Sequence, residues 1–197
     1  MCLEKLVFGK KRIAIQTIKI EALQILNKII VINQILYSYY QNSILNLIML
    51  LFKNIKGERV DPVNHTLEVI KNYPYAEIHI GTDSQNINKE THYTTVIAYR
   101  LGTRGVHYIL SRSSKKIIRD MWTRLWKEAE YSIDVAEWMT QKIAIKLEID
   151  MDYNGDENFE SHKLISAAKG WANSLGYKVN VKPNNQIATR AADYHCK

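Results

Sequence analysis

Two aspartates stand where predicted hydrophobic strands end. Asp83 follows the segment EIHIGT, and Asp150 ends the segment AIKLEID. If the two strands are neighbours in a sheet, their backbones lie about 4.8 Å apart, which lets both carboxylates share one cation. The alternative is that each aspartate turns the chain or caps the next element. The pair therefore predicts either a metal site or two structural caps.

A third carboxylate, Glu128, lies in a long amphipathic helix predicted for residues 117–143. Helical spacing places one stripe of residues toward the sheet, formed by Ile118, Trp122, Leu125, Ala129, Ser132 and Ala136. Glu128 flanks this stripe among apolar neighbours, where a carboxylate is costly unless it is paired or bound to metal. Glu128 is therefore either a metal ligand or the partner of Arg124, four residues earlier, in an ion pair.

The C-terminal sequence RAADYH adds Asp193, on a short helix predicted for residues 186–195. The small residues of this helix, Ala188, Ala191 and Ala192, let it lie close to neighbouring elements. Asp193 is then either a fourth ligand of the same site or an ordinary surface group. In the first case we expect His195 or Lys197 to assist proton transfer or phosphate binding.

The elements that must position these residues alternate between strands and helices. Three strands come first, at residues 77–82, 91–101 and 105–111, and form an antiparallel meander. The long helix, a strand at 144–150, a helix at 161–175, a strand at 177–181 and the C-terminal helix follow. Strands reached through helical crossovers are parallel to their neighbours. We therefore predict an α/β fold with one mixed five-stranded sheet, three strands antiparallel and then two parallel, and helices on its faces.

Residues 1–49 predict a helical extension that is separate from the main domain at 50–197. The extension contains no histidine and no aspartate, which favours packing or self-association over catalysis. Met49 opens the sequence MLLFKNIKGERVD, so a start site there is an alternative. Polar residues interrupt the apolar runs before they reach the roughly 18–20 residues of a membrane span, and no signal-peptide pattern is present. We expect a cytoplasmic protein without a membrane span.

Composition and cysteine content exclude several classes of protein. The chain has 197 residues, of which 46% are hydrophobic and 24% charged, as in an ordinary globular protein. Its two cysteines, Cys2 and Cys196, stand at the chain ends and allow neither a disulfide scaffold nor a zinc ribbon. The P-loop, G-x-S-x-G, H-E-x-x-H and G-x-G-x-x-G motifs are absent. The acidic residues are therefore the main candidates for chemistry.

The net charge of +7 permits an anionic partner, although six basic and two acidic residues give the extension +4 of it. A basic run at the start of the long helix contains Lys115, Lys116, Arg119 and Arg124. This run either approaches a nucleic-acid phosphate backbone or forms a solvated helix face. In the first case Lys115, Lys116 and Arg119 are candidate nucleic-acid-binding residues.

Residues 50–197 contain four motifs: IHIGTDSQ, R-x-x-x-E-A-x-x-S from Arg124 to Ser132, I-D-x-x-x-N-G from Ile149 to Gly155, and GYKVNVKP followed by A-A-D. With these motifs the chain resembles the YkuK family of ribonuclease H-like proteins. The resemblance covers about three quarters of the chain and leaves the extension unexplained. It implies the ribonuclease H fold, whose strand order places the first strand beside the fourth.

The resemblance also implies an acidic site that holds two Mg²⁺ or Mn²⁺ ions. Asp83 is similar to the first-strand aspartate that bridges two metals, and Glu128 to the glutamate on the helix. Asp150 is similar to the aspartate at the end of the fourth strand, and Asp193 to the last acidic residue on the C-terminal helix. Asp152 is a rival for Asp150, because the acidic stretch 151–161 looks longer than the turn of the family.

The resulting expectation is a metal-dependent nuclease that hydrolyses phosphodiester bonds of RNA, DNA or an RNA–DNA hybrid through a two-metal carboxylate site. The alternative is a non-catalytic nucleic-acid or protein-binding module on the same fold, because a fold does not dictate an activity.

Overall fold

The computed structural model divides into two units, Met1–Ile44 and Leu45–Lys197. It describes residues 23–24, 26–32, 51–154, 158, 162–184 and 186–196. In the first unit, residues 23–24 and 26–32 are helical, which confirms the expected N-terminal helix. None of the helices in the described ranges is long and apolar enough to cross a membrane. The domain boundary at residue 49 and self-association through the extension remain predictions.

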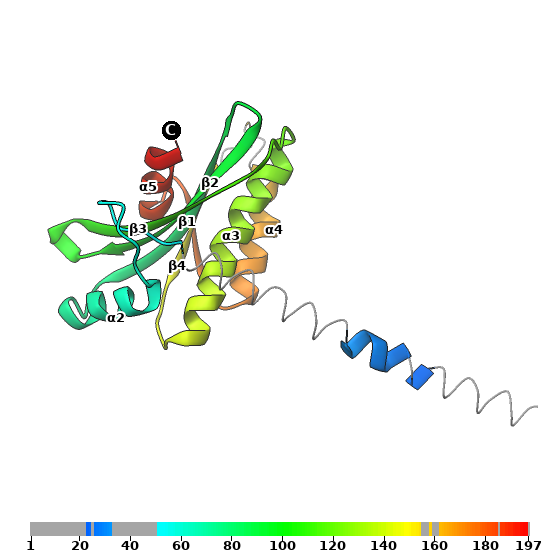
Figure 1. The fold of residues 1–197 in the computed structure, drawn as a ribbon, viewed down its shortest axis with the longest axis horizontal. Helices are drawn as coiled ribbons and strands as arrows, with labels where there is room; N and C mark the ends of the chain where they lie inside the picture. The colour runs from blue at the N-terminus through cyan, green and yellow to red at the C-terminus, as the bar shows by residue number, and fades with distance from the viewer. Residues whose placement is uncertain are drawn as a thin grey trace, which may run out of the picture. The chain divides into compact units, whose positions relative to one another are not determined.

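A mixed five-stranded sheet forms the centre of the second unit, as predicted (Figure 1). Its strands are β1 (Glu77–Ile87), β2 (Glu90–Arg100), β3 (Val106–Lys116), β4 (Glu148–Asn154) and β5 (Lys178–Lys182). They are arranged in the order β3-β2-β1-β4-β5. The first three strands are antiparallel, whereas β4 is parallel to β1 and β5 is parallel to β4. The first strand therefore lies beside the fourth.

Helices cover both faces of the sheet (Figure 1). Helices α3 (Met121–Lys142) and α4 (His162–Ser174) pack on one face, and α5 (Ile187–Cys196) packs on the other against β1 and β2. Helix α2 (Pro62–Asn72) is tied to β2 where Thr66 Oγ1 lies 2.7 Å from the Tyr99 hydroxyl. The predicted stripe of α3 is at least half-buried from Leu125 onward, whereas Ile118 precedes the helix and Trp122 is 37% exposed.

Strand alternation assigns the residues of β1 to the two faces of the sheet. Thr82 and Ser84 face α3, to whose side chains their hydroxyls are hydrogen-bonded. Gly81 faces α5, and a Cβ atom there would lie 2.8 Å from Thr189 Cγ2 and 3.0 Å from Ala188 Cβ. The missing side chain therefore lets α5 lie directly against β1.

The strands that carry the two predicted aspartates differ from expectation at their ends. β1 continues to Ile87, so Asp83 lies inside the strand, opposite Thr94 of β2. β4 covers Glu148–Asn154, so Asp150 also lies within a strand. Backbone pairing with neighbouring strands extends both elements through polar residues, and hydrophobic alternation does not reveal such pairing.

The basic run does not begin the long helix, which corrects the prediction. β3 continues through Lys115 and Lys116, and α3 begins only at Met121. Arg119 lies in the segment between them. The Asp120 carboxylate starts the helix by accepting a hydrogen bond from the Thr123 backbone N–H. β3 remains extended because it pairs with β2 along its full length.

The close approach at Gly81 predicts that Gly81→Ala destabilises the protein by about 1–3 kcal/mol, because α5 must move away from β1. Gly170→Ala is the matched control, since a Cβ atom there meets nothing within 4 Å. This change should be neutral or stabilising, as alanine replaces glycine inside helix α4. Urea unfolding of both variants measures the difference, and equal midpoints would contradict the close packing.

Candidate active site

The parallel ladder between β1 and β4 is short and stops beside the candidate site. It contains three residue pairs, of which the last joins Gly81 to Asp150. Asp83 and Asp152 each stand two residues beyond this pair, so they occupy equivalent positions along the two strands. Because side chains alternate between the two faces of a sheet, those of Asp83 and Asp152 lie on the same face as Gly81 and Asp150. The end of the ladder therefore allows side chains from both faces of the sheet to approach one another.

Asp150 is fully buried and bonded within the protein. Its Oδ1 lies 3.1 Å from His79 Nδ1 and accepts a 2.9 Å hydrogen bond from Asn180 Nδ2, and its Oδ2 accepts a 2.9 Å bond from the Ala188 backbone N–H. Ala188 belongs to the first turn of α5, where a negative charge is stabilised. Burial lowers the pKa of His79, but the hydrogen bond and the charge of Asp150 outweigh it and raise the pKa overall. Asp150 therefore joins β1, β4, β5 and α5.

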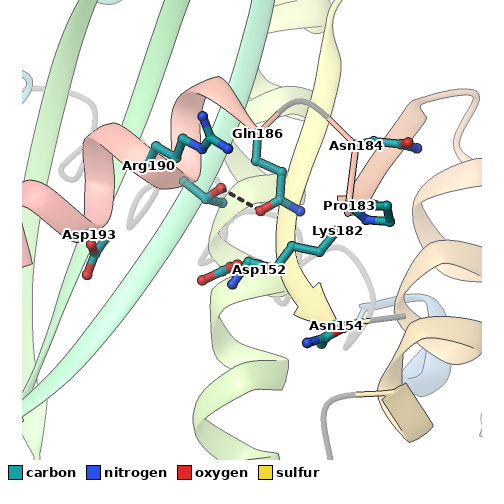
Figure 2. A pocket seen from close by; sticks show the side chains of 9 residues that line it. Asp152, Asn154, Lys182, Pro183, Asn184, Gln186, Arg190 and Asp193 are labelled. Atoms are coloured by element: carbon teal, nitrogen blue, oxygen red, sulfur yellow. Dashed lines mark hydrogen bonds and ion pairs between the residues drawn. The ribbon is translucent and has the colours of Figure 1, made fainter. Parts of the chain in front are cut away.

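Asp152, unlike Asp150, faces a cleft. The cleft has a volume of about 730 Å³, and Asp152, Asp193, Lys182 and Arg190 line part of it. Figure 2 shows Asp152 on one side of this cleft and Asp193, on α5, on the other. Lys182 Nζ lies 2.5 Å from Asp152 Oδ1, in an ion pair whose side chains are 50% and 30% exposed respectively. Asp152 is therefore accessible and already has one cation beside it.

Glu128 is buried, as its place beside the apolar stripe predicts, with 3% of its surface exposed. Its Oε1 accepts a 2.5 Å hydrogen bond from Ser84 Oγ, while Arg124 Nη1 donates to Ser84 Oγ at 3.0 Å and to the Ser84 carbonyl at 2.7 Å. Ser84 thus lies between the two side chains that the alternative interpretation paired directly. Glu128 Oε2 is buried and has no hydrogen-bond partner in the described part of the chain.

Burial raises the pKa of Glu128 to about 8, and the charges of Asp83 and Asp152 add to this shift. The Ser84 hydrogen bond and the charge of Arg124 oppose it. A carboxyl group with such a pKa lacks a compensating cation. Glu128 therefore carries a proton at neutral pH unless positive charge is supplied.

Burial also raises the pKa of Asp83, to about 6. The backbone N–H of Ser84 and the Cys196 thiol lower this pKa, whereas the charges of Asp193 and Asp152 raise it. The Cys196 Sγ also donates to the Asp83 carbonyl oxygen at 3.2 Å. Asp83 is therefore held by α5 on one side and influenced by two further carboxylates.

These electrostatic effects connect the members of one group, which we call the acidic cluster: Asp83, Glu128, Asp152 and Asp193. Asp150 is not among the largest influences on the pKa of Asp83 or Glu128, although it borders one small interior space together with Glu128 and Asp152. Electrostatic interactions thus link three of the four sequence-predicted site residues, Asp83, Glu128 and Asp193, with the rival Asp152. In the described ranges, no three His, Cys, Asp or Glu side chains lie close enough together to hold a metal ion.

The other predicted site residues lie outside the acidic cluster. Lys115, Lys116 and Arg119 are exposed, and strand alternation directs Lys115 and Lys116 to opposite faces. His195 packs against β3, where its Nε2 lies 2.9 Å from the Tyr108 hydroxyl. Lys197 lies outside the described residues.

Lys182 and Arg190 are the cations of the cleft that the sequence analysis did not single out. Lys182 belongs to the GYKVNVKP motif, so its place at the end of the last strand was the available signal. Arg190 is three residues before Asp193 on the same helix, and residues at this spacing lie on one side of a helix.

Comparison with known proteins supports the architecture. A family model described as Ribonuclease H-like matches residues 60–197, which is more than half of the chain. No curated protein matches the sequence.

The raised pKa of Glu128 predicts that the metal-free protein loses stability as the pH rises. A carboxyl group with a pKa of about 8 when folded, against an ordinary value of 4.5, binds more protons in the folded than in the unfolded state. The free energy of unfolding should therefore fall between about pH 5 and pH 8. Glu128→Gln removes this titration. The free energy of unfolding of the variant should therefore rise by about 1 kcal/mol or more relative to that of the wild type over this interval.

Urea unfolding in the presence of a chelator measures both proteins. Asp134→Asn is the matched control, because burial raises the pKa of this other α3 carboxyl to about 6, and its titration ends earlier. The control should still lose stability between about pH 7 and pH 8. An equal loss in the wild type and in Glu128→Gln would contradict the assignment to Glu128.

Proposed function

The chain belongs to the ribonuclease H-like family, and on this premise we propose that it is a metal-dependent nuclease that hydrolyses phosphodiester bonds of RNA, DNA or an RNA–DNA hybrid. The observation that carries the proposal is Glu128, whose Oε2 is buried without a hydrogen-bond partner in the described part of the chain. The raised pKa values of Glu128 and Asp83 indicate that the cations nearby do not compensate for the burial of these two carboxylates. Divalent cations supply such charge.

The acidic cluster would hold Mg²⁺ or Mn²⁺, with Asp152 in place of Asp150. Its donors are carboxylate oxygens, which suit these hard cations. The Asp150 oxygens already accept hydrogen bonds from β1, β5 and α5, whereas Asp152 faces the cleft. A cation would draw the side chains of the cluster together.

The bound ions would supply an activated water and stabilise the charge on the leaving oxygen. The residues of the chain have the positioning tasks. Ser84 and Arg124 fix the Glu128 carboxylate from β1 and α3, and Cys196 holds the backbone at Asp83. Burial of Glu128 excludes water from one side of the cluster.

The cations around the cluster would attract the substrate. Lys182 and Arg190 line the cleft, and the exposed Lys115, Lys116 and Arg119 remain candidate contacts to the phosphate backbone. Since Lys115 and Lys116 point to opposite faces, only one of them can contact a given strand from one face.

A non-catalytic nucleic-acid or protein-binding module is the second candidate. The observation that favours it is the ion pair between Lys182 and Asp152, in which a side chain already neutralises one carboxylate of the cluster. If this pair is permanent, the cluster is a structural feature and the fold serves binding alone.

The nuclease proposal predicts cleavage of labelled RNA, DNA or hybrid by the wild type with Mg²⁺ or Mn²⁺. Asp83→Asn should reduce the rate to that of the chelated protein, because one cation ligand is lost. Asp134→Asn is the control, a partly buried α3 carboxyl whose pKa responds to Glu130 and Glu137 and not to the cluster. Gel analysis of the products measures the rates. Absence of cleavage by the wild type on all three substrates would refute the proposal.

The ion pair predicts that Lys182 competes with a bound cation for Asp152. Lys182→Met should therefore raise the affinity for Mn²⁺ several-fold, as measured by calorimetry. Lys178→Met is the matched control. Lys178 lies on the same strand as Lys182, but its Nζ pairs with Glu148 Oε1 of β4 at 2.8 Å. Equal Mn²⁺ affinities in the two variants would show that Asp152 is not a ligand.

A further inference from the structure

A second hollow, with a volume of about 320 Å³, lies beside the outer strand β3 on the α5 face of the sheet. Two of its lining residues, Lys53 and Arg112, carry positive charge, and His195 adds an imidazole ring. Leu51, Ile55 and Leu110 add apolar surface. We call this feature the Arg112 hollow. The acidic cluster does not contribute to its wall.

The backbone holds Lys53 in this position. Its N–H donates to the Leu110 carbonyl at 2.8 Å, and its carbonyl accepts from the Leu110 N–H at 2.9 Å. These two bonds attach the segment before α2 to the edge of β3 as an antiparallel bridge. Lys53 and Arg112 therefore meet at the hollow although they are far apart in the sequence.

His195 orients the Arg112 side chain. Arginine only donates, so His195 Nδ1, which lies 3.4 Å from Arg112 Nη2, acts as the acceptor. Its Nε2 then carries the proton and donates to the Tyr108 hydroxyl at 2.9 Å. Tyr108 thus holds the His195 ring, and this ring contacts the guanidinium without cancelling its charge.

The positive charge of the hollow is not compensated by carboxylates. Among the described residues, neither Arg112 nor Lys53 forms an ion pair with an aspartate or a glutamate. Arg112 has five N–H donors in a planar arrangement that matches a phosphate group. An arginine and a lysine exposed at the same hollow are therefore suited to a phosphate anion.

The register of the sheet places the hollow beside the acidic cluster. Asp83 pairs with Thr94 of β2, and Thr94 pairs with Arg112 of β3, so the three residues form a row across one face. Two strand spacings separate the backbones of Asp83 and Arg112 by about 10 Å. A strand of nucleic acid that enters the acidic cluster can reach the hollow at this separation.

We propose that the Arg112 hollow binds a backbone phosphate of the nucleic-acid strand that is held at the acidic cluster. This inference rests on the proposed function. Carboxylates repel phosphate groups, so a substrate strand needs cations on either side of the cluster to stay in place. The apolar side chains of the hollow would contact the sugar or base of the same nucleotide.

The test uses the full chain with Asp83→Asn, which prevents cleavage, and fluorescence anisotropy with labelled RNA, DNA and hybrid. Arg112→Gln should weaken binding roughly tenfold and lower the slope of log K against log salt by about one. Arg112→Lys should keep the slope and lose part of the affinity, because it retains the charge without the planar donors. Arg100→Gln is the matched control. Arg100 lies at the end of β2, away from the row that contains Thr94 and Arg112, and it forms an ion pair with Glu77 of β1.

Equal binding by Arg112→Gln and Arg100→Gln would overturn the inference and leave the proposed nuclease intact. Failure of the Asp83→Asn parent to bind any nucleic acid, together with absence of cleavage by the wild type, would refute both. Binding of inorganic phosphate that depends on Arg112, with nucleic-acid binding unchanged, would show a site for a small anion and overturn the assignment to a strand. Circular dichroism checks that each variant is folded.

Discussion

A carboxylate without access to water must find its hydrogen bonds inside the protein, and Asp150 finds them in three directions. His79 of β1, Asn180 of β5 and the first turn of α5 all bond to it. These bonds fix the strand order at the centre of the sheet and the position at which α5 begins. Gly81 then allows α5 to lie against β1, so that Asp193 and Cys196 come near Asp83. The arrangement of the acidic cluster therefore depends on a carboxylate that does not belong to it.

The contrast between Asp150 and Glu128 explains why two buried carboxylates have different roles. All hydrogen bonds of Asp150 come from neutral or positively charged donors around it, and it stabilises the fold without a metal ion. Glu128 has one oxygen bonded to Ser84 and one without a partner in the described residues, and its neighbours include Asp83 and Asp152. Charge of the same sign without compensation is unfavourable in a protein interior. The cation site that we propose would supply the missing positive charge.

Much of the fold was predictable from the sequence, and the detail of the site was less so. Hydrophobic alternation and helical spacing gave the order of strands and helices, and the same spacing placed Glu128 on a buried flank. The sequence could not decide whether Asp150 or Asp152 is the better candidate ligand. Residues two apart share one face of a strand, and the sequence does not show where the ladder with β1 ends. Lys115 and Lys116 were assigned to a helix because pairing between strands extends β3 beyond its hydrophobic part. Arg112 gave no local signal, since its partner His195 is 83 residues away.

The most direct test of the cluster measures Mn²⁺ binding by calorimetry together with urea unfolding, for the wild type, Asp152→Asn and Asp150→Asn. We predict that the wild type binds Mn²⁺ and that Asp152→Asn loses this binding with little change in the unfolding midpoint. Asp150→Asn should unfold at lower urea, because the amide cannot accept all three hydrogen bonds, while its folded form still binds Mn²⁺. Retention of wild-type affinity by Asp152→Asn, or loss of affinity in a fully stable Asp150→Asn, would contradict the account.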